Sequence, residues 1–85
     1  MIIDFHKDFI KAFKKLSPKT KKRFQERLLL FEKDQFNSTL NNHALSGKYQ
    51  GYKSINVTGD IRAIYGKNAQ GVIFVAIGSH SNLYG

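Results

Sequence analysis

The chain has 85 residues, enough for one small domain and too few for two. Hydrophobic residues make up 41% of the chain and include seven Phe and four Tyr, so an ordinary core of modest size can form. Cys is absent from the sequence, which excludes disulfides and thiolate metal sites and fits a reducing cytoplasm. We therefore expect a single cytoplasmic domain spanning residues 1–85.

Charge is the strongest bulk signal in the sequence. Fourteen Lys and Arg outnumber six Asp and Glu and give a formal net charge of +8. Such an excess indicates a polyanionic partner, either a nucleic acid or an acidic protein. Charge alone separates neither RNA from DNA nor catalysis from binding.

No membrane association is expected. No segment approaches the roughly 20 consecutive apolar residues that a membrane-spanning helix needs. The first residues, MIIDFHKDF, include Asp4 and Asp8 and lack an apolar run followed by a small-residue cleavage site. This segment is therefore predicted to be folded chain and not a secretion signal.

The first half of the chain is predicted to form one strand and two helices. Residues 1–6 form an apolar run suited to a strand, and residues 7–16 place apolar side chains at helical spacing. Ser17 is a good helix N-cap and Pro18 is favoured at the first helical position, so a second helix should begin there and extend to about Lys33. The two helices should pair as a hairpin with one apolar face toward a sheet.

The second half is predicted to form strands. Residues 34–50 are polar and rich in turn-forming residues. Three strands should follow, at 52–57, 61–65 and 72–77, separated by turns. Alternation along the middle strand places Arg62 on the opposite face from its neighbours Ile61 and Ala63.

The tail, residues 78–85, is polar with one apolar anchor, Leu83. The predicted order is therefore β-α-α-β-β-β. This order predicts an α+β fold in which a two-helix hairpin packs on one face of a small, largely antiparallel sheet.

A metal site or cofactor is not expected. His6, His43 and His80 are far apart in the sequence, and none has Cys or paired carboxylates nearby at ligand spacing. No glycine-rich phosphate-binding loop is present either. Any catalysis should therefore use side chains alone.

Metal-free cleavage of RNA needs a base for the 2′-hydroxyl, an acid for the leaving 5′-oxygen and a cation for the phosphate. The C-terminal half contains residue types that can fill these roles. They are His43, Lys48, Tyr52, Lys53, Asp60, Arg62, His80 and Tyr84. Many basic domains contain such a set, so the residue types alone leave the reaction open.

Three motifs narrow the choice. The segments HALSGKYQGY at 43–52, NVTGDIRAIY at 56–65 and IGSHSNLYG at 77–85 resemble the RelE/YafQ superfamily of toxin–antitoxin ribonucleases. The resemblance covers nearly the whole chain, because the order of elements also fits a RelE-like fold. It implies a toxin that enters the ribosomal A site, cleaves mRNA there and is neutralised by a cognate antitoxin.

The resemblance also implies residue roles. His43 matches a catalytic or RNA-contacting histidine, and Asp60 matches an active-site acid. His80 matches the principal general acid or base, and Arg62 the strand arginine that acts on the scissile phosphate. Tyr84 matches a terminal aromatic residue that stacks on the substrate or orients it.

Four further residues are predicted to contact substrate: Lys48, Tyr52, Lys53 and Asn56. Asn56 departs from the pattern, since YafQ-like sites often have a second histidine there. An amide cannot transfer protons near neutral pH, so Asn56 can bind or orient but cannot act as acid or base.

Each candidate also has a purely structural interpretation. Asp60 is favoured in a hairpin turn for backbone reasons, and Tyr84 could cap the core beside Leu83.

The nuclease hypothesis requires Arg62 and His80 to meet around one phosphate, on the same side of the molecule. Two alternatives stay open: a non-catalytic ParE-like toxin that inhibits DNA gyrase, and a basic nucleic-acid-binding module.

Lysines concentrate around the Ser17-Pro18 turn. They are Lys11, Lys14, Lys15, Lys19, Lys21 and Lys22. Such residues usually form a solvated helix face. Their density also suits contact with the phosphate backbone of ribosomal RNA, which positions a protein without reading sequence.

Overall fold

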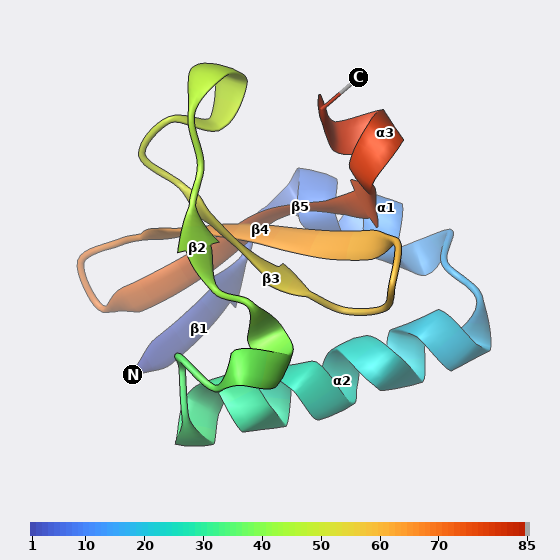
Figure 1. Cartoon of the computed structure of the whole chain (residues 1–85), viewed down its shortest axis with the longest axis horizontal. Coiled ribbons are helices and arrows are strands. Elements are labelled where there is room, and N and C mark those ends of the chain that lie inside the picture. The colour runs from blue at the N-terminus through green and yellow to red at the C-terminus, as the bar shows by residue number, and fades with distance from the viewer. Residues whose placement is uncertain (85) are drawn as a thin grey trace.

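The structure is a computed structural model and describes residues 1–84; Gly85, the last residue of the third motif, lies outside the described residues. A five-stranded sheet has the order β1-β5-β4-β3-β2, and the long helix α2 and the short helix α3 lie on opposite sides of it (Figure 1). The elements are β1 (Ile2–Phe5), α1 (Lys7–Lys14), α2 (Pro18–Lys33), the 3₁₀ turn η1 (Ser38–Leu40), β2 (His43–Ala44), the 3₁₀ turn η2 (Gly47–Tyr49), β3 (Lys53–Asn56), β4 (Ile61–Lys67), β5 (Gly71–Ser79) and α3 (His80–Tyr84). The predicted α+β fold is confirmed.

Capping sets the start of both long helices. The imidazole Nδ1 of His6 accepts a hydrogen bond from the Asp8 amide at 3.0 Å and caps α1. The Ser17 hydroxyl accepts from the Thr20 amide at 3.1 Å, with Pro18 at the first position of α2. Both caps satisfy N–H donors that the first turn of a helix leaves unpaired. The start predicted for the second helix is confirmed.

The sheet is mixed but largely antiparallel. β1 pairs with β5 in parallel, while the three remaining pairs are antiparallel. Gly71 stands opposite Ile2 in the parallel pair, where a Cβ atom would collide with the Ile2 backbone. Glycine at this position therefore permits the close approach of β1.

The structure extends the predicted secondary structure in three places. The short strand β2 lies within the region 34–50, where only turns were expected. β4 continues to Lys67 and β5 begins at Gly71, which shortens the predicted turn between them. The tail, for which no helix was predicted, forms α3, whose start is capped by the Ser79 hydroxyl accepting a hydrogen bond from the Asn82 amide at 3.2 Å.

A β-bulge interrupts the pairing of the two central strands. Ile64 pairs with Ala76 and Tyr65 with Phe74, so Val75 has no opposite residue. One extra residue reverses the alternation of side chains along β5. Phe74 and Ile77, three residues apart, consequently both lie in the helix-side core.

Phe74 is the centre of that core. Its ring lies 5.4–5.9 Å, centroid to centroid, from five other aromatic rings: Phe5, Phe9, Phe24, Phe31 and Tyr65. α1 and α2 contribute three of these rings, so both helices pack on the same face of the sheet (Figure 1). Within residues 1–84, no helix is long and apolar enough to cross a membrane.

Replacing Phe74 by Leu should lower the free energy of unfolding by roughly 1–3 kcal/mol, because the ring is fully buried and its contacts are lost. Phe36→Leu is the matched control, since Phe36 is 66% exposed. The control should change stability by no more than about 0.5 kcal/mol. Denaturant unfolding followed by circular dichroism measures both, and equal effects of the two substitutions would contradict the assigned core.

Candidate functional site

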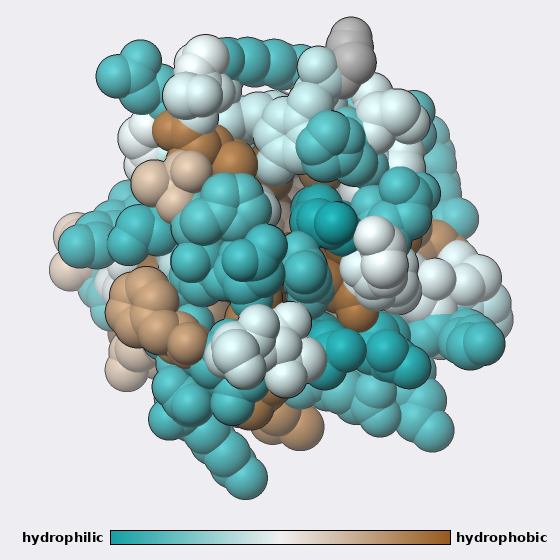
Figure 2. All heavy atoms as spheres, viewed as in Figure 1, coloured by the Kyte–Doolittle hydropathy of each residue, from teal (hydrophilic) through white to brown (hydrophobic). Residues whose placement is uncertain are grey.

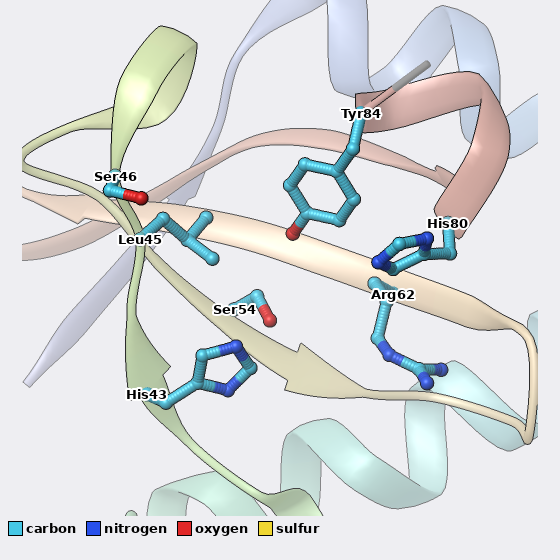
Figure 3. Close-up of a pocket in the computed structure, with 7 residues that line it drawn as sticks. All are labelled: His43, Leu45, Ser46, Ser54, Arg62, His80 and Tyr84. Carbon is cyan, nitrogen blue, oxygen red and sulfur yellow. The ribbon is translucent and has the colours of Figure 1, made fainter.

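A polar cavity of about 220 Å³ opens on the face of the sheet opposite α1 and α2. It lies between the segment around β2 and the C-terminal helix α3 (Figure 3). The surrounding surface is mostly hydrophilic, with small apolar patches (Figure 2). The cavity is lined by His43, Leu45, Ser46, Ser54, Arg62, His80 and Tyr84.

Arg62 contributes the cation from β4. Its Nη1 donates hydrogen bonds to the carbonyl oxygens of Thr58, Gly59 and Ile61, at 3.0–3.2 Å. These carbonyls, from the β3–β4 turn and the start of β4, hold the guanidinium in place. The hydrogen bonds of the described chain use only Nη1, so the Nε and Nη2 edge remains available to a ligand.

His80 and Tyr84 come from α3, which is fixed at both ends. The His80 amide donates to the Asp60 carbonyl oxygen at 3.1 Å. Near the other end, Leu83 is buried against Gly78 of β5, as expected for the apolar anchor. The two rings lie 4.7 Å apart between centroids, so they enter the cavity as a pair.

His43 faces them from the opposite wall (Figure 3). Its Nδ1 lies 2.8 Å from the Asn41 carbonyl oxygen. A carbonyl can only accept, so Nδ1 donates and the neutral ring has its lone pair on Nε2. Asn42, which precedes His43, fixes this segment to the core, because the Tyr65 hydroxyl donates a hydrogen bond to Asn42 Oδ1 at 2.8 Å.

The floor of the cavity contains a polar residue that sequence reasoning missed. Ser54 is fully buried, and its Oγ has no hydrogen-bond partner in residues 1–84. Asn56 shares this face of β3, and its buried Oδ1 is likewise unpartnered. The alternation of side chains along β3 could have identified Ser54, because it lies two residues before Asn56 and therefore on the same face of the strand. Leu45 and Ser46, which also line the cavity, had no such signal.

Not all predicted residues join the cavity. The Asp60 side chain is absent from its lining, although the Asp60 backbone binds α3. Lys48 and Tyr52 line a neighbouring hollow. Lys53 places its Nζ 5.6 Å from the centre of the Phe36 ring, and Asn56 lies beside the cavity, opposite Arg62 in the strand register.

The electrostatics of the cavity favour an anion. None of its lining residues is a carboxylate, and a guanidinium and two imidazoles are present. The ion pair formed within residues 1–84 is Arg23–Glu26, outside the cavity. His6 Nδ1 accepts from the Asp8 amide, so its ring is neutral and makes no ion pair with the Asp8 carboxylate 3.7 Å away. No group of His, Asp or Glu side chains in the part of the chain that the structure describes gathers in a way that could hold a metal ion.

Solved structures show the same fold in bacterial toxins. YafQ from E. coli matches with a TM-score of 0.82 and 20% identity over 99% of this chain and 98% of that one. The YafQ of an E. coli DinJ–YafQ toxin–antitoxin complex gives 0.79 and 22%, over 99% and 97%. A YoeB/ParE toxin from Agrobacterium tumefaciens gives 0.76 and 14%, over 94% and 99%. The fold is therefore that of the RelE/ParE toxins.

The family follows from the sequence match. A model of the family described as "bacterial toxin of type II toxin-antitoxin system, YafQ" matches residues 1–85. No curated protein matches the chain. The chain belongs to the YafQ family of toxins of type II toxin–antitoxin systems.

Replacing Tyr65 by Phe should weaken the attachment of the cavity wall at residues 41–44 to the core. The substitution removes the hydrogen bond to Asn42 and leaves a partly buried acceptor unpaired, which should cost about 1–3 kcal/mol of stability. Amide hydrogen exchange should also become faster at residues 41–44 while β5 stays protected. Unchanged exchange there would show that the bond does not position His43.

Proposed function

We propose that this toxin is a ribosome-dependent endoribonuclease that cuts mRNA in the cavity without a metal ion. The observation that carries the proposal is that two imidazoles, a guanidinium and a phenol line one cavity, to which no carboxylate of residues 1–84 contributes. Toxins of the YafQ family are ribonucleases. The chemistry is attack by a ribose 2′-hydroxyl on its neighbouring phosphate, leaving a 2′,3′-cyclic phosphate and a free 5′-hydroxyl.

Arg62 holds the scissile phosphate. Its Nε and Nη2 edge can bind two phosphate oxygens at once, a geometry that suits a planar guanidinium. The turn carbonyls that accept from Nη1 keep the group in place before substrate arrives. A preorganised cation stabilises the negative charge that develops on the phosphate during attack.

The two histidines divide the proton transfers. His43 donates through Nδ1 to a carbonyl, so its Nε2 can take the proton from the attacking 2′-hydroxyl. His80, in its protonated form, gives a proton to the departing 5′-oxygen from the opposite wall. Tyr84 lies against His80 and stacks on a base next to the cut. Asp60, which the resemblance matched to an active-site acid, contributes instead through its backbone carbonyl, which accepts from the His80 amide at the start of α3.

Lysines beside the cavity supply affinity for ribosomal RNA. Lys11 and Lys15 line a separate hollow whose other wall includes Ser79 and Asn82, next to His80. Neither lysine pairs with a carboxylate in the described chain. This hollow, which Asp8 also lines, places the two lysines across from the start of α3, and phosphates bound by them would bring mRNA in the A site toward the cavity.

A cognate antitoxin neutralises the toxin by covering the same site. E. coli YafQ has been crystallised with the antitoxin DinJ. An acidic antitoxin segment would complement the +8 charge and cover Arg62 or displace α3. α3 suits displacement because it is only five residues long.

His80→Ala should reduce mRNA cleavage by about 10²–10⁴-fold, because general acid catalysis is lost. Mapping of mRNA ends in cells expressing the toxin measures this effect. Ser81→Ala, an exposed position on the same helix, is the control and should cut normally. Codon-phased cuts that persist in His80→Ala would remove His80 from the mechanism, whereas DNA damage without cuts would favour gyrase inhibition.

The double variant Lys11→Glu/Lys15→Glu should bind ribosomes more weakly, because two phosphate contacts become repulsive. Lys33→Glu/Lys67→Glu carries the same change in charge away from the hollow between α1 and α3 and serves as control. Co-sedimentation with ribosomes over a range of salt concentrations measures the difference, and the slope of log affinity against log salt should become shallower only in the first variant. Equal binding by the two variants would contradict the proposed contact.

A further inference from the structure

A run of aromatic rings leads out of the cavity. Tyr84 lies beside His80 in the cavity and also makes an edge-to-face contact with Tyr49 of η2, with centroids 5.9 Å apart. Tyr49 in turn contacts Tyr52 edge to face at 6.4 Å. The rings come from α3, from η2 and from the segment before β3, so the fold brings together residues far apart in the sequence.

The outer end of this run borders a second hollow, of about 370 Å³. Lys48 stands at its edge, with Nζ 5.4 Å from the centre of the Tyr49 ring. Tyr52 is 37% exposed. The hollow is lined by His6, Asp8, Lys48, Tyr49, Tyr52, Val75 and Ala76.

Tyr52 has a fixed position. A Cβ atom at Gly66 would lie 2.8 Å from two carbon atoms of the Tyr52 ring, so the ring rests directly on the backbone of β4. The absence of a side chain at Gly66 gives the ring a flat support. A supported and partly exposed ring loses little conformational freedom when a planar ligand stacks on it.

The chemistry of the hollow fits a nucleobase better than a phosphate. The Asp8 carboxylate on its wall repels phosphate but can accept a hydrogen bond from the amino group of a base. Lys48, at the edge, can bind a phosphate outside the hollow. Aromatic platforms flanked by cations are the usual means of holding single-stranded nucleic acid.

We infer that this second hollow is a nucleotide subsite: the base of a nucleotide next to the scissile one stacks on Tyr49 and Tyr52, while Lys48 holds its phosphate. The inference rests on the proposed function, because the aromatic run begins at His80 and Tyr84. It extends the substrate from one phosphate to a short single strand. Tyr49, which was not among the predicted site residues, becomes the central contact.

Binding to an uncleavable strand tests the subsite separately from catalysis. The probe is a fluorescein-labelled hexamer of deoxyuridine, which lacks the attacking 2′-hydroxyl, titrated with the toxin and followed by anisotropy. Tyr49→Leu should weaken binding roughly 5- to 100-fold, the range for losing one stacked base. Tyr49→Phe retains the ring and should bind within about two-fold of the unsubstituted toxin, which also shows that the loop tolerates substitution.

Phe36→Leu is the matched control, because Phe36 is also an exposed aromatic residue with a lysine near its ring but lies outside the run. It should leave affinity unchanged. A hexamer with one abasic position supplies a double-mutant cycle: the missing base should weaken binding to the unsubstituted toxin and have little further effect on Tyr49→Leu.

The outcomes separate this inference from the proposed function. Tyr49→Leu affinity within two-fold of the unsubstituted toxin, or an equal loss in Phe36→Leu, overturns the subsite whatever happens to cleavage. His80→Ala should fail to cut RNA, and Tyr49→Leu added to it should still weaken hexamer binding by a similar factor. Normal cutting by His80→Ala overturns the catalytic assignment and leaves the binding result to decide the subsite.

Discussion

The packing of aromatic rings around Phe74 decides which face of the sheet is free. Five rings surround it, and those from α1 and α2 hold both helices on one side. The bulge at Val75 is part of the same arrangement, since it turns Ile77 toward the helices as well. With the apolar side chains concentrated on the helix side, the opposite face can be hollow and polar. The site depends on this division.

β4 connects the two faces. Ala63 and Tyr65 point into the core, while Arg62, the residue before Ala63, points to the other face and reaches the cavity. Tyr65 serves both sides, because its ring packs against Phe31 and its hydroxyl binds Asn42 beside the cavity wall. We therefore expect changes in the core to reach the cavity wall through this hydrogen bond.

The sequence predicted those parts of the fold that depend on interactions between residues close together in the chain. The cap at Ser17 and the alternation around Arg62 depend on neighbours in the chain, and both were predicted. β2 and α3 depend on distant partners: two residues form a strand only because β3 lies beside them, and a five-residue helix persists because Leu83 packs on Gly78. The cavity wall at Leu45 and Ser46 could not be predicted for the same reason.

The buried polar atoms of β3 bear on how the site works. Within residues 1–84, Ser54 and Asn56 each have a buried oxygen without a hydrogen-bond partner, and such an atom costs stability that an apolar residue there would not. The hypothesis that a ligand pairs with them explains why polar residues occupy these positions. Because Asn56 cannot exchange a proton, the proton transfers of the proposed reaction fall to His43 and His80, which face each other across the cavity. An acid and a base on opposite walls, with the phosphate held between them by Arg62, is the arrangement that in-line displacement requires.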